Sequence, residues 1–402
     1  MRKITSLVVM SALVLVLSHS SRADDAAAAD RAYREALDTA YPPVEHPPAL
    51  AEYASPARYD ELYLGDELET ALKTVNNKGG AMAWGWSYRM VSLNEMARVT
   101  NDSKYLATNL RVIRALLAAR DDRTGTKIFD GRVMPAWSSD GYRKGEQALF
   151  LVHTGMIVHP MLDAVHLART MKDVPDDVRK GLEEIVAPAL ASIACHDDGW
   201  HDGPGEGEGH YIMLNEEQGS EGKPQPGNRL AAMGRALYAA YRVTKDEKYL
   251  TRTRALARYM QRRLQVTENG AYIWSYWLPL APVTPGDPIT DKPEDSSHGS
   301  LTMAFPAMLA EDNVIFTAEH MKRFGKTVTQ GLGRLGDGVL FGDVGGSAGS
   351  NVKRLGIPST WLQIAPYAPE VREPIVSFYL RHMPKPRPLD VAYLVRFGSA
   401  AK

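Results

Sequence analysis

The sequence of 402 residues has a single cysteine, no large excess of charge of either sign, and no long hydrophobic run after its N-terminal segment. One cysteine cannot form an internal disulfide, so a small disulfide-stapled scaffold is excluded. The 47 Lys and Arg against 48 Asp and Glu leave a formal net charge of −1, so no global basic field predicts a nucleic-acid partner. No later segment has the roughly 20 uncharged apolar residues of a membrane-spanning helix. With 44% hydrophobic residues, the chain is expected to be globular.

The N-terminus has the pattern of a secretory signal peptide. Arg2 and Lys3 precede the apolar segment Leu7 to Leu17, and Ser21-Arg22-Ala23 offers small residues where signal peptidase cuts. The apolar segment, about eleven residues, is too short to cross a bilayer. We therefore expect residues 1–23 to be removed and the mature protein to be periplasmic or secreted, without contact with a membrane.

Repeated pairs of helices are expected along the rest of the chain. Trp86 to Arg120 and Ala231 to Leu264 share one pattern: a helix, a Thr-x-Asp turn, and a second helix that opens with Lys-Tyr-Leu. Two further pairs fit this pattern less closely: Glu146 to Met171 followed by Val178 to His196, and His298 to Asp312 followed by Thr317 to Gly331. First helices are apolar nearly all round and second helices have a charged face, as expected of inner and outer helices.

This pattern predicts an all-α fold, an (α/α) toroid or barrel of about five to seven helical hairpins. Residues 24–57 are expected to form a leader helix and a Pro-rich strap, and residues 58–402 a single toroid domain. Long loops precede the inner helices, so they should gather at one mouth, where loops of this length are usually functional. These loops are 121–145, 197–227, 270–297 and 336–358.

Polar residues near the starts of inner helices are the first candidates for a site. Asn228 and Arg229 open one such helix, His298 lies at the start of another, and His153 lies two turns into a third. Helix N-termini also present backbone N–H groups to anions. For Asn228 the alternative is ordinary N-capping, and for the two histidines it is a structural role with satisfied ring nitrogens.

Aromatic side chains are concentrated in the same loops. Tyr272, Trp274 and Tyr276 share one face of the segment AYIWSYW if this segment is extended. Rings of this kind combine an apolar face with a polar edge and commonly stack on sugars, so a saccharide cleft is favoured over a small hydrophobic pocket. Plain packing of these loop aromatics is the alternative. The residues expected to bind substrate are Trp84, Trp86, Arg89, Tyr211, Tyr272, Trp274 and Glu294.

The segment Cys195 to Tyr211 is rich in acidic residues and glycine and contains three histidines. Such a segment can hold calcium through oxygens or zinc through nitrogens. It matches neither the EF-hand pattern nor H-E-x-x-H. We therefore expect a solvated loop or a lid that contacts substrate, no metal ligand and no cofactor, with calcium as the alternative.

Several of these features together resemble secreted bacterial polysaccharide lyases. They are the helix pairs with Thr-x-Asp-x-x-Tyr-Leu turns, Asn228-Arg229, AYIWSYW, and the segment from Glu294 to Gly299. The likeness is to helical-toroid lyases that act on uronic-acid polymers such as glucuronan and alginate. It implies a carbon–oxygen lyase for polysaccharide degradation, with an anionic polysaccharide as partner. Such enzymes remove the C5 proton of a uronate and expel the 4-O-linked sugar by β-elimination.

The resemblance also implies roles for individual residues. Asn228, helped by Arg229, would neutralise the substrate carboxylate, because the charge that develops during proton removal must be stabilised. His298 would be the base or a second neutralising group, and Tyr276 would take or return the proton. His153 is a further imidazole candidate. The chain departs from better-known toroidal lyases because it lacks an adjacent Asn-His pair and an Arg followed about seven residues later by a loop Tyr.

Other functions are open at this stage because a fold does not choose a chemistry. A glycoside hydrolase on the same architecture would need two opposed carboxylates, for which Glu146, Glu294 and Asp295 are candidates. A uronate epimerase is a second alternative. A periplasmic glycan-binding protein without catalysis is a third.

Overall fold

The computed structural model describes residues 24–399 apart from 215, 218, 285–288 and 290. The predicted signal peptide, residues 1–23, lies outside the described residues. Among the helices of the described ranges, none combines the length and the apolar character needed to span a bilayer.

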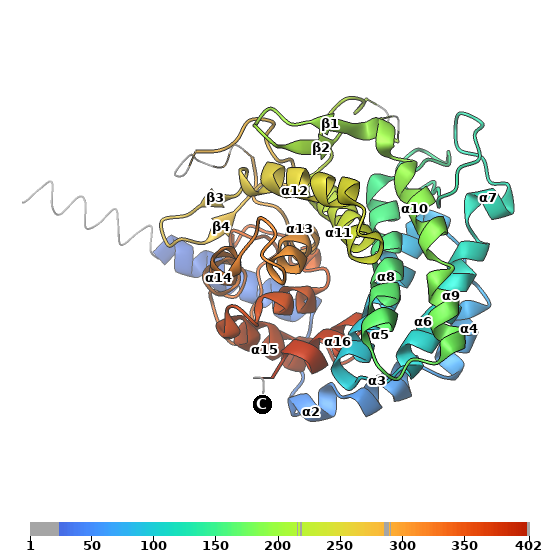
Figure 1. Cartoon of the computed structure of the whole chain (residues 1–402). Helices are drawn as coiled ribbons and strands as arrows, with labels where there is room; N and C mark the ends of the chain where they lie inside the picture. The colour runs from blue at the N-terminus through green and yellow to red at the C-terminus, as the bar shows by residue number, and fades with distance from the viewer. Residues whose placement is uncertain (1–23, 215, 218, 285–288, 290, 400–402) are drawn as a thin grey trace, which may run out of the picture.

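The helices form a ring, which confirms the predicted all-α toroid (Figure 1). Within the described part of the chain, each of six inner elements packs on the next, and the last packs on the first. In ring order they are α5 (Ser87–Thr100), α8 (Leu151–Thr170), α11 (Gly227–Thr244), α13 (Ser296–Ala310), the 3₁₀ segment η6 (Pro358–Ile364) and α16 (Pro388–Phe397).

An outer layer of helices covers this ring. In the same order, the outer helices are α6 (Lys104–Ala118), α9 (Asp176–Glu183) with α10 (Val186–Ala194), α12 (Glu247–Gln261), α14 (Ala318–Lys326), α15 (Arg372–His382) and α3 (Pro56–Tyr63). The sequence predicted one helix where α9 and α10 lie. The helix is broken there because Pro188 has no N–H to donate to the carbonyl of Glu184.

The remaining elements are short and connect the layers. They are α2 (Leu50–Tyr53), α4 (Asp66–Leu72), α7 (Asp121–Thr124), η1 (Lys78–Gly80), the π turn η2 (Met82–Trp86), η3 (Asp197–Gly199), the π turn η4 (Thr327–Leu332), η5 (Val352–Arg354) and η7 (Pro369–Val371). Two antiparallel hairpins complete the set: β1 (Trp200–Asp202) with β2 (Gly209–Tyr211), and β3 (Gln265–Val266) with β4 (Tyr272–Ile273).

The two most similar repeats have the same turn between inner and outer helix. In the first, Asn101 ends α5 in the left-handed region, at φ 54°, and the hydroxyl of Thr100 accepts from the backbone N–H of Asp102 at 3.2 Å. In the second, Lys245 ends α11 at φ 59°, and Thr244 accepts from Asp246 at 3.1 Å. The Thr-x-Asp pattern therefore specifies a helix C-cap that reverses the chain.

Small residues let the inner helices approach closely. A Cβ on Gly155 of α8 would lie 2.5 Å from the backbone of Ala232 and Met233 in α11. A Cβ on Gly234 would lie 2.7 Å from the ring of Phe305 in α13. The glycines of the apolar inner helices thus mark where one inner helix crosses the next.

The long loops meet at one end of the ring, as predicted. The N–H of Gly227, at the start of α11, donates to the carbonyl of Tyr276 at 3.2 Å. Isolated bridges join Ser275 to Pro293 and Asp295 to Asp343. The N-terminal ends of the inner helices and these three loops therefore form one surface, which we call the mouth. The fourth loop, 121–145, joins it through Tyr142, whose ring lies 5.7 Å from the guanidinium of Arg229.

Residues 24–40 form a helix that lies against the C-terminal third of the chain. The hydroxyl of Tyr33 donates to the carbonyl of Leu340 at 3.0 Å, Leu37 is fully buried, and Asp30 is ion-paired with Arg334. After this helix, the N–H of Val44 donates to the carbonyl of Arg381 at 2.7 Å.

Candidate active site

A cavity of about 440 Å³ opens at the mouth between the starts of α5 and α16. We call it the mouth cavity. Its lining is mainly apolar and aromatic, and it includes Trp84, Trp86 and Tyr88 together with Arg89 and Arg387. Three residues of the predicted substrate-binding set, Trp84, Trp86 and Arg89, therefore lie together as expected.

A continuous row of polar side chains crosses the neighbouring part of the mouth. We call it the mouth row, and its members are Asp295, His298, Tyr276, Arg229 and Glu217. The rings of Tyr276 and His298 are 5.0 Å apart, Tyr276 is in hydrogen-bonding contact with Arg229, and Arg229 is ion-paired with Glu217. Residues from three separate segments of the chain are thereby brought into one site.

Three aromatic side chains link the mouth row to the mouth cavity. The guanidinium of Arg229 lies 5.7 Å from the ring of Tyr142, and this ring lies 5.8 Å from that of His153. The ring of His153 in turn lies 5.6 Å from that of Trp84, which lines the mouth cavity. The row and the cavity therefore form a single candidate site.

Asp295 positions His298 through both of its oxygens. Its Oδ1 caps α13 by accepting from the backbone N–H of His298 at 3.1 Å, and its Oδ2 contacts the ring Nδ1 at 2.7 Å. Burial raises the pKa of Asp295, but the hydrogen bonds and charge of His298 outweigh burial and hold this pKa below its usual value. The side chains are 25% and 30% exposed, so the pair is accessible to a ligand.

Several buried polar atoms near the mouth have no hydrogen-bond partner among the described residues. They include both ring nitrogens of His153, Oδ1 of Asn228 and Oε1 of Glu294. Asn228 is the second residue of α11 and its side chain does not cap the helix, so N-capping does not explain its presence there. Since buried polar groups are normally paired, atoms of this kind favour a site that a ligand or water completes.

Glu294 is a buried acid behind the mouth row and not a surface residue. Its Oε2 accepts from Trp274 Nε1 and from the hydroxyl of Thr302, the latter at 2.8 Å. Burial raises the pKa of Glu294 to about 8, although these two hydrogen bonds oppose the shift. The sequence-based prediction that Glu294 contacts substrate directly was therefore wrong, because its side chain is fully buried.

Three aromatic residues of the predicted substrate-binding set are core residues. Tyr272 and Trp274 pack on Phe324 and are 6% and 1% exposed. Tyr211 is 1% exposed and lies under Trp200. Alternate side chains of the AYIWSYW segment do share one face, as the pattern predicted. On that face Tyr272 and Trp274 lie in the core, and Tyr276 lies at the mouth.

His153 and Arg89 also have positions that the sequence did not specify. His153 is fully buried, and burial together with the nearby charge of Arg229 lowers its pKa to about 3. Its ring is therefore neutral at physiological pH. Arg89 lines the mouth cavity, but both of its terminal nitrogens bind the carboxylate of Glu67, at 2.6 and 2.7 Å.

The segment that suggested a metal site folds into the β1–β2 hairpin. Glu208 anchors it by accepting from Arg262 and Arg263 at 3.0 Å each, while His210 stacks on Tyr259 with a ring distance of 4.7 Å. Within the described ranges, no group of three or more His, Cys, Asp or Glu side chains is arranged to hold a metal ion.

Four members of the site are absent from the sequence-based prediction: Tyr88 and Arg387 of the mouth cavity, Glu217 of the mouth row, and Tyr142. Glu217 and Tyr142 belong to long loops, in which no periodicity indicates the direction of a side chain. Their membership of the predicted mouth loops was the only available signal.

No family model and no curated protein sequence matches this chain. Among solved structures, the α-1,6-mannanase GH76A of Salegentibacter sp. HEL1_6 is similar at a TM-score of 0.49 and 14% identity, covering 87% of this chain and 98% of that one. An inactive variant of this enzyme in complex with α-1,6-mannotriose gives a TM-score of 0.46 at 14% identity, with 79% and 88% covered.

These neighbours are glycoside hydrolases, and this finding contradicts the predicted carbon–oxygen lyase with its glucuronan and alginate substrates. Charge pairing at the mouth is the physical reason that the prediction was wrong. β-Elimination needs free positive groups to neutralise a uronate carboxylate. Here Arg229 is paired with Glu217, His298 with Asp295, and Arg89 with Glu67.

Proposed function

We propose that the protein is a glycoside hydrolase that acts on a neutral glycan at the mouth. The observation that carries this proposal is the mouth row, which has a carboxylate at each end, Asp295 and Glu217, beside a cavity lined by tryptophan. Hydrolysis of a glycosidic bond needs one group that protonates the leaving oxygen and one that activates water.

The mouth row supplies one group for each role. In the protonated state of His298, Asp295 balances the charge on Nδ1, and the other ring nitrogen carries the proton for the leaving oxygen. At the other end the carboxylate of Glu217, which is ion-paired with Arg229, accepts a proton from the attacking water. Tyr276 and Arg229 lie between these groups and can bind sugar hydroxyls.

Charge and shape at the mouth support a neutral substrate. Arg387, the second arginine of the mouth cavity, is paired with Asp390 at 2.9 Å, just as Arg89 is paired with Glu67. A polyanion would gain little from cations that are already neutralised and would meet the carboxylates of the mouth row. The faces of Trp84 and Trp86 are suited to the apolar faces of sugar rings.

The unpartnered polar atoms also support a hydroxyl-rich ligand. Neutral His153 can donate from one nitrogen and accept at the other, and Asn228 Oδ1 can accept a hydrogen bond from a hydroxyl.

The proposal also includes two expectations from the sequence: catalysis without a cofactor, and export of the protein to the periplasm or the medium. Export is checked by N-terminal sequencing of the protein recovered from the periplasm or medium.

The proposal is tested by measuring reducing ends released from a panel of neutral glycans, with α-1,6-mannan and its oligosaccharides first in the panel. Asp295→Asn and Glu217→Gln should each lower kcat/KM at least 10³-fold on the glycan that is cleaved. Glu183→Gln is the matched control, because Glu183 is also paired with an arginine, Arg169, but lies on the outer helix α9.

Two results would contradict the hydrolase. One is glycan binding without new reducing ends, which would indicate a glycan-binding protein. The other is full activity in both mouth variants, which would place the chemistry elsewhere. In either case circular dichroism must show that the variants are folded.

A further inference from the structure

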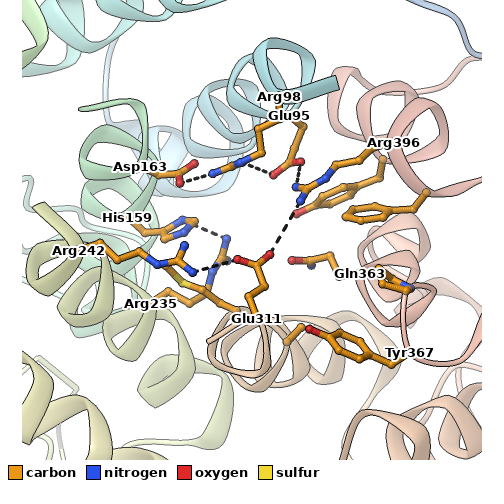
Figure 2. Close-up of a pocket in the computed structure, with 15 residues that line it drawn as sticks. Glu95, Arg98, His159, Asp163, Arg235, Arg242, Glu311, Gln363, Tyr367 and Arg396 are labelled. Atoms are coloured by element: carbon orange, nitrogen blue, oxygen red, sulfur yellow. Dashed lines mark hydrogen bonds and ion pairs between the residues drawn. The ribbon is translucent and has the colours of Figure 1, made fainter. Parts of the chain in front are cut away.

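A second cavity, of about 150 Å³, is shown in Figure 2. It lies at the end of the ring opposite the mouth. Its rim is formed where inner helices end: Arg242 lies near the end of α11, Glu311 directly follows α13, and Arg396 lies near the end of α16. Four arginines and three carboxylates line it. The proposed hydrolase does not use this cavity.

Three of the four arginines are neutralised by carboxylates. Arg98 contacts Glu95 at 2.7 Å and also Asp163, and Arg396 contacts Glu95. Arg242 contacts Glu311 at 3.0 Å and, on the half-exposed rim, Asp312 at 2.8 Å. These ion pairs tie the ends of the inner helices together.

The fourth arginine, Arg235, has no carboxylate partner. It lies in the middle of α11 and is 7% exposed, and none of the described carboxylates is within ion-pairing distance of it. Its hydrogen-bond partner is Nδ1 of His159, at 3.0 Å (Figure 2). Asp163 and Glu95 act on Arg235 only from beyond this distance, and burial lowers the pKa of its guanidinium. A buried cation without a carboxylate in direct contact is unfavourable, so the arrangement favours an anion placed against Arg235.

His159 is neutral and cannot itself carry positive charge toward an anion. A guanidinium has no acceptor, so Nδ1 must accept the hydrogen bond and the ring proton must be on Nε2. Burial and the nearby charge of Arg235 lower the pKa of His159 well below its usual value, in agreement with this assignment. His159 thus fixes one edge of the Arg235 guanidinium and leaves other N–H donors of this group for a ligand.

We propose that Arg235 binds a small monocarboxylate in this cavity, at the end of the ring opposite the mouth. A cavity of 150 Å³ accommodates a ligand of about the size of benzene, which a short-chain carboxylate matches. The planar guanidinium donates two parallel hydrogen bonds to a carboxylate. Glu95, Asp163 and Glu311 in the same lining disfavour a dianion such as phosphate.

The proposal is tested on the full mature chain by thermal unfolding and titration calorimetry with sodium acetate and sodium propionate. Sodium chloride and inorganic phosphate at matched ionic strength are the comparison salts. We expect a saturable rise in Tm and a measurable heat with the carboxylates, and neither with chloride or phosphate.

Variants separate a specific site from a general salt effect. Arg235→Met should weaken carboxylate binding at least tenfold. Ala307→Leu fills part of the cavity without changing any charge and should do the same, so the test stands even if Arg235→Met fails to fold. Arg111→Met is the matched control, because this exposed arginine pairs with Glu69 on the outer surface and its loss should leave binding unchanged.

Equal responses to chloride and acetate would overturn the proposal, as would undiminished binding in both cavity variants. Tighter binding of phosphate than of acetate would overturn the choice of a monocarboxylate. None of these results depends on glycan hydrolysis, so the two proposals fail or succeed separately.

Discussion

At the scale of single residues, neighbours along the chain can have opposite roles. Glu294 and Asp295 are adjacent carboxylic acids, yet burial raises the pKa of the first to about 8, whereas contact with His298 lowers that of the second. One is held as a neutral acid in the core and the other as an accessible carboxylate at the mouth. Their environments, and not their types, decide these roles.

The raised pKa of Glu294 predicts a loss of stability with rising pH. In the unfolded chain the group ionises near pH 4.5, but in the folded protein it keeps its proton up to about pH 8. Between these values the unfolded state alone loses the proton, so the free energy of unfolding falls by up to about 1.4 kcal/mol per pH unit. Below pH 4.5 this contribution is fully present.

Glu294→Gln should remove this dependence. Chemical denaturation at several pH values between 5 and 8 should show that the variant gains stability relative to wild type as pH rises. Glu35→Gln, on an exposed position of the N-terminal helix, is the control and should follow the wild type throughout. Parallel curves for wild type and Glu294→Gln would mean that Glu294 is already ionised in the folded state.

At the scale of elements, the packing of the ring depends on glycine where two inner helices cross. Gly155→Ala places a Cβ 2.5 Å from the backbone of α11, so one helix must shift. We expect a loss of about 1–3 kcal/mol in the free energy of unfolding. Urea denaturation of the purified variant measures this loss.

Gly85→Ala is the control for the crossing, because a Cβ at Gly85 meets no atom within 4 Å. It should be neutral or slightly stabilising, since alanine restricts the unfolded chain. If Gly155→Ala were as stable as Gly85→Ala, the close approach of α8 and α11 would be wrong.

At the scale of the whole molecule, the N-terminal helix fastens the C-terminal part of the ring. Leu37 is fully buried there, and Tyr33 and Asp30 bind residues about 300 positions away in the sequence. Leu37→Ala should lower the free energy of unfolding by about 2–4 kcal/mol, because it leaves a cavity between the helix and the body. Activity at 25 °C should persist, since the mouth is not touched.

Thermal unfolding checks this expectation, with Glu35→Ala on the exposed side of the same helix as the control. A Tm for Leu37→Ala equal to that of the control would show that the helix is not docked in solution.

Much of the architecture was accessible from the sequence because helical repeats are local. The Thr-x-Asp turns at Thr100 and Thr244 contain the atoms that cap their own helices, so the pattern could be identified without tertiary information. Alternation between apolar and charged helices indicated which would lie inside the ring. The loop boundaries placed Asn228, His298 and Tyr276 at one mouth for the same reason.

The sequence by itself thus determined a ring of paired helices with its functional loops at one end, since these follow from periodicity and local hydrogen bonds. Only the tertiary structure decided which loop side chains face the mouth and which fill the core. It joined Arg229 to Glu217 and left Arg235 without a carboxylate. Charge pairing depends on contacts between distant segments, so the sequence could not show that the cations expected to hold a uronate were already neutralised.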